Sequence, residues 1–304
     1  AAMHPMSAKP NQAAPSALAV LLGLTGVIIF AGTLPATRIG VEVFDPGFLT
    51  FARAAAAGLL ALATLLLMKR KFPTAHWVQL AFAGVTLVFG FTGFMALAMV
   101  TLPSAHGGVV LGILPLTTAI FAALWAGERP SASFWICGVI GAALVVVYTL
   151  RASGGKTGVE IGDLWLLLAA VTASAGYVVS GKLSAHLPGW EVICWALVLM
   201  LPISLAATWW LADIASFEAA EAIHWLSFVY VSLFSMFLGF FAWNTGLRMG
   251  GLARIGQLQL LQTFFTLAIA AALLGEAVTL ETVLFAVAVL AMVLLGRRTC
   301  VGHK

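Results

Sequence analysis

Four polar side chains recur at helical spacing in an otherwise apolar stretch late in the chain. They are Gln259, Gln262, Thr263 and Thr266. The intervals i, i+3, i+4 and i+7 put all four on one face of a helix. Amides and hydroxyls are unfavourable in apolar surroundings unless they meet hydrogen-bonding partners, water or a solute. The pattern therefore predicts either the wall of a solute-binding cavity or polar contacts that join packed helices.

Six further residues in other apolar runs could contribute to such a site. These candidate substrate-binding residues are Thr33, His106, Tyr177, Ser235, Trp243 and Asn244. The indole of Trp243 could stack on a flat ligand, although tryptophans also gather at membrane interfaces without any role in binding. For His106, near the start of its run, the alternatives are a gate or site residue and a histidine that is satisfied at the interface.

Two residues are candidates for a conformational role. Pro115 lies in the middle of an apolar run, where a proline removes a backbone hydrogen bond and kinks the helix. Gly239 shares a face with Ser235 in a later run, and small residues let helices approach closely. Gly108 and Gly112 form a GxxxG pair, which indicates close helix packing rather than chemistry.

The chemistry that is absent narrows the function. The sequence contains no P-loop, HExxH or nucleophile-elbow motif, and no His, Cys and carboxylate set that suggests a metal. No carboxylate lies deep in an apolar run, so no proton carrier is apparent. Arg53 lies only a few residues into the second run. We therefore predict that the protein is not an enzyme and has no cofactor or metal site.

Composition indicates the elements that hold these residues. The 304 residues are 62% hydrophobic and 9% charged, whereas soluble domains carry roughly 25% charged residues. A helix of about 20 apolar residues crosses the hydrocarbon core, and only helices or closed barrels satisfy the backbone there. The apolar runs lack the two-residue alternation of barrel strands. The predicted fold class is an all-α integral membrane protein.

Apolar runs separated by polar breaks give ten predicted transmembrane helices. They are residues 16–37, 48–68, 76–99, 103–126, 132–150, 163–182, 190–210, 224–246, 252–274 and 279–297. The predicted organisation is a flexible N-terminal tail (1–15), a first five-helix repeat (16–150), an inter-repeat loop (151–162), a second, inverted five-helix repeat (163–297) and a cytoplasmic tail (298–304).

The positive charges predict an orientation, because Lys and Arg accumulate on the cytoplasmic side of membrane proteins. With the N-terminus inside, 11 of the 15 Lys and Arg residues fall in cytoplasmic segments, and reversing the orientation leaves four there. We therefore predict a multi-pass protein of a bacterial inner membrane, with both termini in the cytoplasm.

The two halves of the chain are similar at a few positions. A shift of 148 residues aligns His224 and Trp225 with His76 and Trp77, and Gly275 and Glu276 with Gly127 and Glu128. Chance is the alternative for any one match, but the matches fall at equivalent places in the predicted topology. Five spans per half is an odd number, so the second copy would be upside down in the bilayer. Inverted repeats with a site at their interface are a transporter design.

These features resemble the drug/metabolite transporter superfamily, specifically its EamA-type members. The stretches that carry the resemblance are LGILPLTTAIFAALWAGERPSASFWICGVIGAALVVVY (111–148) and LLQTFFTLAIAAALLGEAVTLETVLFAVAVLAMVLLG (260–296). Within the superfamily, the chain looks most like the aromatic amino-acid exporters of the YddG type. The resemblance implies a basket-like fold in which spans three, four, eight and nine, with parts of one and six, surround a central cavity.

One departure from the superfamily bears on energy coupling. Its small four-span members use a glutamate on the first helix for proton-coupled export, and no glutamate occurs between Leu18 and Arg38. This puts proton antiport by that mechanism in doubt.

The sequence thus predicts an exporter of aromatic or other apolar amino acids that works by alternating access. Amides and hydroxyls would meet the carboxylate and ammonium groups, and aromatic residues would meet the side chain. A strongly anionic substrate would require Lys or Arg deep in the apolar runs, and we expect none there. The alternatives are an exporter of drug-like or other small neutral metabolites and a non-transporting scaffold. The expected partners are a small-molecule substrate and the lipid bilayer, not nucleic acid. The oligomeric state, a monomer included, stays open.

Overall fold

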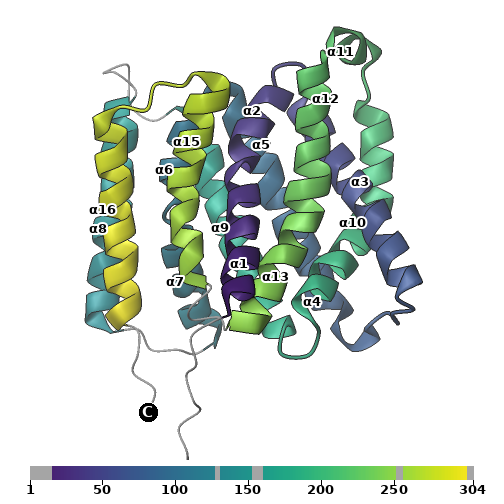
Figure 1. Cartoon of the computed structure of the whole chain (residues 1–304), viewed down its shortest axis with the longest axis horizontal. Coiled ribbons are helices and arrows are strands. Elements are labelled where there is room, and N and C mark those ends of the chain that lie inside the picture. Colours follow the sequence, from purple (N-terminus) through teal and green to yellow (C-terminus); the bar gives the residue numbers. More distant parts are fainter. Residues whose placement is uncertain (1–15, 127–130, 153–159, 251–255, 300–304) are drawn as a thin grey trace, which may run out of the picture.

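The computed structural model of the chain describes residues 16–126, 131–152, 160–250 and 256–299. Within these ranges every regular element is helical. The long helices stand side by side with their axes roughly aligned, and successive ones run in opposite directions (Figure 1). The structure therefore confirms the all-helical fold class.

Seven helical segments of the described residues are long and apolar enough to cross a membrane. They are Ala17–Gly40, Pro46–Leu67, Thr74–Thr101, Ser104–Ala122, Ile161–Leu183, Gly189–Leu211 and Ala222–Gly246. Three shorter apolar segments, Trp135–Tyr148, Leu258–Leu274 and Leu280–Leu295, coincide with the remaining predicted spans. Seven candidate spans are thus confirmed, and the count of ten stays a prediction.

Several spans consist of more than one helix. The helices of the first half are α1 (Ala17–Ala31), α2 (Thr33–Gly40), α3 (Pro46–Leu67), α4 (Trp77–Ala83), α5 (Thr92–Thr101), α6 (Ser104–Leu111), α7 (Leu114–Ala126) and α8 (Ala132–Ala152). Those of the second half are α9 (Ile161–Leu183), α10 (Gly189–Leu211), α11 (Ile214–Ala219), α12 (Ala222–Val229), α13 (Gly239–Gly250), α15 (Gln262–Leu274) and α16 (Leu280–Thr299).

The most extensive packing joins helices from different halves of the chain. α3 packs on α10, α1 on α13, α8 on α16 and α5 on α9. One apolar core between the halves includes Leu65, Leu80 and Leu197, all of which are nearly or fully buried. The outward faces are apolar too, since Trp209 and Trp210 are 87% and 86% exposed. A surface of this kind suits lipid rather than water.

Among the described residues, four spans lose regular α-helical geometry partway along their length, and a fifth begins with an irregular stretch. Gly32 separates α1 from α2, and Gly112 and Ile113 separate α6 from α7. π-helical stretches lie between α4 and α5 (Gly84–Phe91) and between α12 and α13 (Tyr230–Leu238), and a 3-10 stretch (Gly256–Leu261) leads into α15. Irregular turns inside helices are frequent at functional sites.

The break between α6 and α7 has a local cause in the sequence. Pro115 has no amide hydrogen, so the carbonyl of Leu111 cannot receive the usual i+4 helical bond. The preceding amides of Gly112 and Ile113 turn instead to the carbonyls of Val109 and Val110, three residues back. A helix interruption at this place is therefore confirmed; its conformational role is untested.

Candidate functional site

A cavity lies in the middle of the bundle, at the level of the helix irregularities. Its polar lining residues are Thr33, Arg53, Thr92, Tyr177, Ser235, Gln259, Gln262, Thr263 and Thr266. Phe30, Phe91, Phe240, Met95 and Met236 are among the apolar ones. The empty space between the walls, including the part open to solvent, is about 1170 Å³. Both halves of the chain contribute residues.

The predicted stripe of amides and hydroxyls forms one wall of this cavity. Gln259 lies in the 3-10 stretch and the other three residues lie on α15, yet all four line the same space. Thr266 also serves in packing, because its hydroxyl donates a 2.9 Å hydrogen bond to the carbonyl of Ala31. The stripe therefore has both features: its four residues line a cavity, and Thr266 also joins two helices.

The GxxxG pair, Gly108 on α6 and Gly112 directly after it, faces this stripe. A Cβ atom on Gly108 would lie 3.0 Å from Cγ2 of Thr266. A Cβ atom on Gly112 would lie 3.3 Å from the hydroxyl oxygen of Thr263. The missing side chains let α6 and α15 approach closely, so the packing interpretation of the pair is confirmed.

The position of Arg53 is the one that differs most from the sequence-based expectation. It comes seven residues after the first residue of α3, which places it about 10 Å along the helix axis. Its side chain is buried, lines the cavity, and donates a 3.3 Å hydrogen bond from Nη2 to Oγ of Ser235. The hydroxyls of Ser235 and Thr33 are in turn 2.7 Å apart. The expectation that no basic residue lies deep in the apolar runs is therefore wrong.

Local sequence explains where α3 begins and hence where Arg53 lies. Pro46 occupies the first turn, and Oδ1 of Asp45 accepts a 3.0 Å hydrogen bond from the amide of Phe48. A capping carboxylate and a proline in the first turn fix the start of a helix. The contact with Ser235, 182 residues away in sequence, was not foreseeable from this segment.

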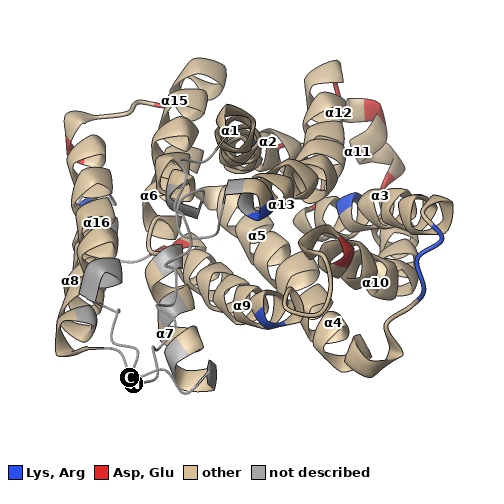
Figure 2. Ribbon diagram, turned by 60° about the horizontal axis from the view of Figure 1, so that its bottom comes forward, with Lys and Arg blue, Asp and Glu red and all other residues tan. Residues whose placement is uncertain are grey.

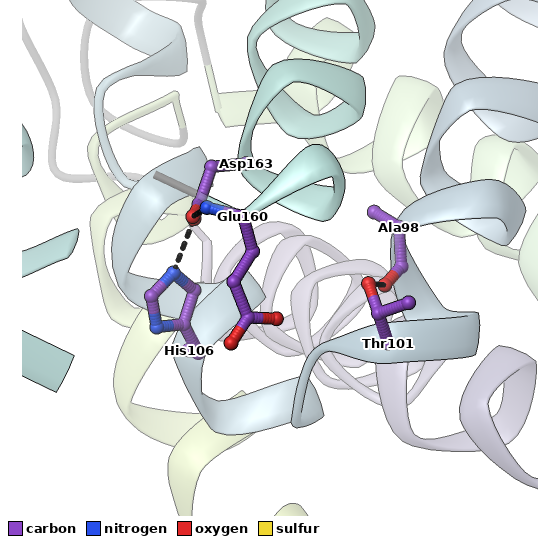
Figure 3. Close-up of polar contacts among 5 residues, drawn as sticks. All are labelled: Ala98, Thr101, His106, Glu160 and Asp163. Carbon is purple, nitrogen blue, oxygen red and sulfur yellow. Dashed lines mark hydrogen bonds and ion pairs between the residues drawn. The ribbon is translucent and has the colours of Figure 1, made fainter. Parts of the chain in front are cut away.

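His106 lies outside the cavity lining and pairs with an acidic residue instead. Its Nε2 lies 2.7 Å from Oδ1 of Asp163, and both side chains are 8% exposed. Figure 3 shows the imidazole directed at the carboxylate across the gap between α6 and α9. The other oxygen of Asp163 accepts the amide of Glu160 at 3.0 Å. The ring of Tyr148 lies 5.0 Å from that of His106.

Glu276 from the second half holds the start of α6. Its Oε1 accepts hydrogen bonds from the amide and hydroxyl of Ser104, at 2.8 and 3.0 Å, and its Oε2 accepts the amide of Ala105 at 2.7 Å. A carboxylate suits the free amides of a helix N-terminus. Gly275 permits this placement, because it ends α15 with a left-handed φ of 63°. The matching pair, Gly127 and Glu128, lies outside the described residues.

Trp243, Asn244 and Gly239 pack between helices and are not among the residues that line the cavity. Trp243 on α13 packs against Gly26 of α1, because a Cβ atom added to Gly26 would lie 2.9 Å from the Cβ of Trp243. Asn244 similarly approaches Gly189 at the start of α10. Gly239, the first residue of α13, packs against Phe30. Pro115 is the second residue of α7, and its side chain lies outside the part that the structure describes.

A comparison with protein families decides the class of protein. A model of the EamA-like transporter family matches residues 17–150 and again residues 160–296. This chain belongs to the EamA-like transporter family. It is therefore a membrane transporter, as predicted, and the name of the family points to transport rather than to catalysis.

Individual relatives agree with this membership. The EamA-like chain is 43% identical over 277 residues to the "Uncharacterized transporter YdeK" of Bacillus subtilis (strain 168), covering 91% of this chain and 96% of the relative. It is 26% identical over 226 residues to a "Probable terminal-alkyne amino-acid exporter" of Streptantibioticus cattleyicolor, covering 72% of each. One crystal structure matches with a TM-score of 0.61 at 21% identity, covering 92% of this chain and 98% of the other, and this likeness concerns the fold.

The cavity of this EamA-like transporter offers groups for a polar solute with an apolar part. Amides can donate and accept hydrogen bonds, hydroxyls can do the same, and a guanidinium can only donate. The aromatic and methionine side chains supply apolar contact area. A cluster of three or more His, Cys, Asp or Glu side chains that could hold a metal is absent from the described residues.

Proposed function

We propose that this EamA-like transporter exports aromatic or other apolar amino acids by alternating access through the central cavity. The observation that carries the proposal is the lining itself, in which Gln259 and Gln262 face a space that Phe30, Phe91 and Phe240 also border. Such a mixed lining suits a zwitterion that bears an apolar side chain. A relative described as a probable amino-acid exporter supports the same substrate class.

An inverted repeat of five helices per half is part of the proposal, and the packing supports it. The repeat would relate α1 to α9, and the α5 span to the α13 span. α1 packs on α13 and α9 packs on α5, which is the relation a two-fold axis requires. The two ranges matched by the family, 17–150 and 160–296, coincide with the proposed halves.

The helix irregularities support the same repeat. A shift of 148 residues carries the π-helical stretch Gly84–Phe91 to 232–239, which overlaps the second one, Tyr230–Leu238. The same shift carries the break at 112–113 to 260–261, where the 3-10 stretch ends. Interrupted helices at corresponding repeat positions are typical of the sites of secondary transporters.

We further propose an inner-membrane location with both termini in the cytoplasm. Figure 2 shows Lys and Arg at the ends of α3, α9 and α13, and acidic residues around α11 and α12. In Figure 1 one end of the bundle holds the start of α1 and the ends of α3, α9, α13 and α16, and α11 lies at the opposite end. This distribution supports a cytoplasmic assignment of the basic end.

A counterflow assay tests the proposed function. Proteoliposomes loaded with an unlabelled amino acid should accumulate the labelled one, with phenylalanine and tryptophan more effective than charged amino acids. Running the panel with and without a pH gradient would reveal proton coupling. Saturable flux of neutral drug-like metabolites without any amino-acid flux would favour the first alternative. Absence of all saturable flux would favour a non-transporting scaffold.

A further inference from the structure

Arg53 is a charged residue in a place where charge is unfavourable. Arg53 is 2% exposed, and it lies on the inner face of a helix whose length and hydropathy suit a membrane span. A guanidinium stays protonated in proteins, so burial does not neutralise it. Charged residues inside membrane spans therefore have partners or line cavities that carry substrate.

The described part of the chain supplies no anion to Arg53. None of the ion pairs among the described residues includes it. Two carboxylates are buried in the part of the chain that the structure describes, and both are engaged elsewhere: Glu191 lies 3.0 Å from Nε of Arg70, and Asp163 lies 2.7 Å from Nε2 of His106.

The hydrogen-bonding capacity of Arg53 is also largely unused. Of its five N–H donors, one reaches Ser235 at 3.3 Å. The Nε atom is buried and has no hydrogen-bond partner. A buried donor without an acceptor is unfavourable, so the guanidinium is poised for an acceptor that enters the cavity.

The surroundings limit what that acceptor can be. Thr33 and Ser235 place two hydroxyls beside Arg53, and Gln262 belongs to the lining of the same cavity. One positive charge balances one negative charge, and the planar guanidinium matches the two oxygens of a carboxylate. Phe30, Phe91 and Phe240 border the same cavity and supply apolar contact.

We propose that Arg53 is the anchor for the carboxylate of the transported substrate, which is a small monocarboxylate with an apolar or aromatic remainder. This inference rests on the proposed transport function and narrows its substrate class. The carboxylate would accept hydrogen bonds from Arg53 while Ser235 holds the guanidinium in place. Neutral drug-like solutes would leave Arg53 without an anion.

Binding of matched probes to the purified full-length protein in detergent tests the anchor. The probes are phenylalanine, phenylacetate, phenylalaninamide and benzyl phosphate, and the readout is the dissociation constant from titration calorimetry. We expect the two carboxylates to bind about ten- to a hundredfold more tightly than the amide, the range of a hydrogen-bonded charge pair. Equal affinity for phenylalanine and its amide would overturn the proposal, and so would a preference for benzyl phosphate.

Three variants test whether the guanidinium of Arg53 causes the preference for carboxylate probes. R53Q should remove the preference for carboxylates, and R53K should retain part of it, because lysine keeps the charge without the planar fork. Arg38 provides a matched control: it donates to the carbonyls of Met99 and Val100, so R38Q should leave the preference unchanged. Should R53Q fail to fold, the wild-type comparison and R53K still decide the question. Wild-type discrimination in a folded R53Q variant would contradict the anchor.

The outcomes separate this inference from the function on which it rests. Arg53-dependent binding of phenylacetate without any amino-acid flux would retain the anchor and reject amino-acid export. Amino-acid flux together with equal handling of the amide would retain export and reject the anchor.

Discussion

Nε2 of His106 lies 2.7 Å from Oδ1 of Asp163, and this pair joins the start of α6 to the start of α9. Both side chains are buried, and the dashed line in Figure 3 marks the direct contact between them. The cavity-lining residues Gly108 and Tyr177 lie further along the same two helices. The pair therefore fixes two walls of the cavity at the end of the bundle where α11 lies.

Removing one member of this pair should destabilise the protein. Asp163→Ala or His106→Ala leaves a buried polar group without its partner, which costs about 2–4 kcal/mol. We expect a lower midpoint of thermal unfolding for each variant, and a double variant less destabilised than the sum. The exposed Glu218 gives a control, and Glu218→Gln should match the wild type. Strict additivity of the two single changes would contradict a direct interaction.

Glu276 should stabilise α6 from a distance of 172 residues in sequence. Glu276→Ala removes the acceptor for the amides of Ser104 and Ala105, and loss of such a cap costs about 1–2 kcal/mol. Hydrogen exchange at these two amides should accelerate. Glu276→Gln should have a smaller effect, because its amide oxygen can still accept one bond. Unchanged exchange in the alanine variant would show that Glu276 does not cap α6.

The close approach of α6 and α15 can be tested at a single methyl group. Gly108→Ala would put its Cβ about 3.0 Å from Cγ2 of Thr266 and should destabilise the protein, by about 1–3 kcal/mol as for other overpacked sites. Thr266→Ser removes that Cγ2 and keeps the hydroxyl that donates to Ala31. The double variant should therefore be more stable than Gly108→Ala alone. A double variant that is no more stable would place the strain elsewhere.

Gln259 should also matter for transport, because it lines the cavity from the 3-10 stretch. Gln259→Leu keeps the size of the side chain and removes its hydrogen-bonding groups, so we expect at least about a tenfold loss in the efficiency of flux, the value of one hydrogen bond to a charged group of the substrate. Asn244→Leu should have a smaller effect, since Asn244 packs at Gly189 rather than in the cavity. Initial rates in proteoliposomes over a range of substrate concentrations measure both. Equal losses would remove the distinction between the two positions.

The sequence predicted the elements better than the contacts. Apolar run lengths indicated where helices lie, because lipid imposes helical structure on each run. The spacing of Gln262 and Thr266 was enough to predict that both line one cavity, since the helical period alone determines which residues share a face. Gly108 and Gly112 were similarly recognisable as packing positions.

Contacts between distant segments were not predictable in this way. Arg53 looked like a charge near a span end, and its depth depends on the start of α3 and on Ser235 from the other half. For His106 the sequence left open a gate or site residue and a satisfied interfacial histidine, and its acidic partner lies 57 residues further on. Trp243 is aromatic and lies in the same apolar run as Ser235, but the direction of its side chain depends on how α13 packs against α1.

The central claim is that the cavity between the halves carries the transported solute. Its most direct test is counterflow of labelled phenylalanine into proteoliposomes that contain either the wild type or Gln262→Ala, with Trp243→Phe as the matched change outside the cavity. We predict saturable flux for the wild type and for Trp243→Phe, and at least about a tenfold loss for a folded Gln262→Ala, the value of one hydrogen bond to a charged group. Undiminished flux through Gln262→Ala, or no saturable amino-acid flux in the wild type, would contradict this account.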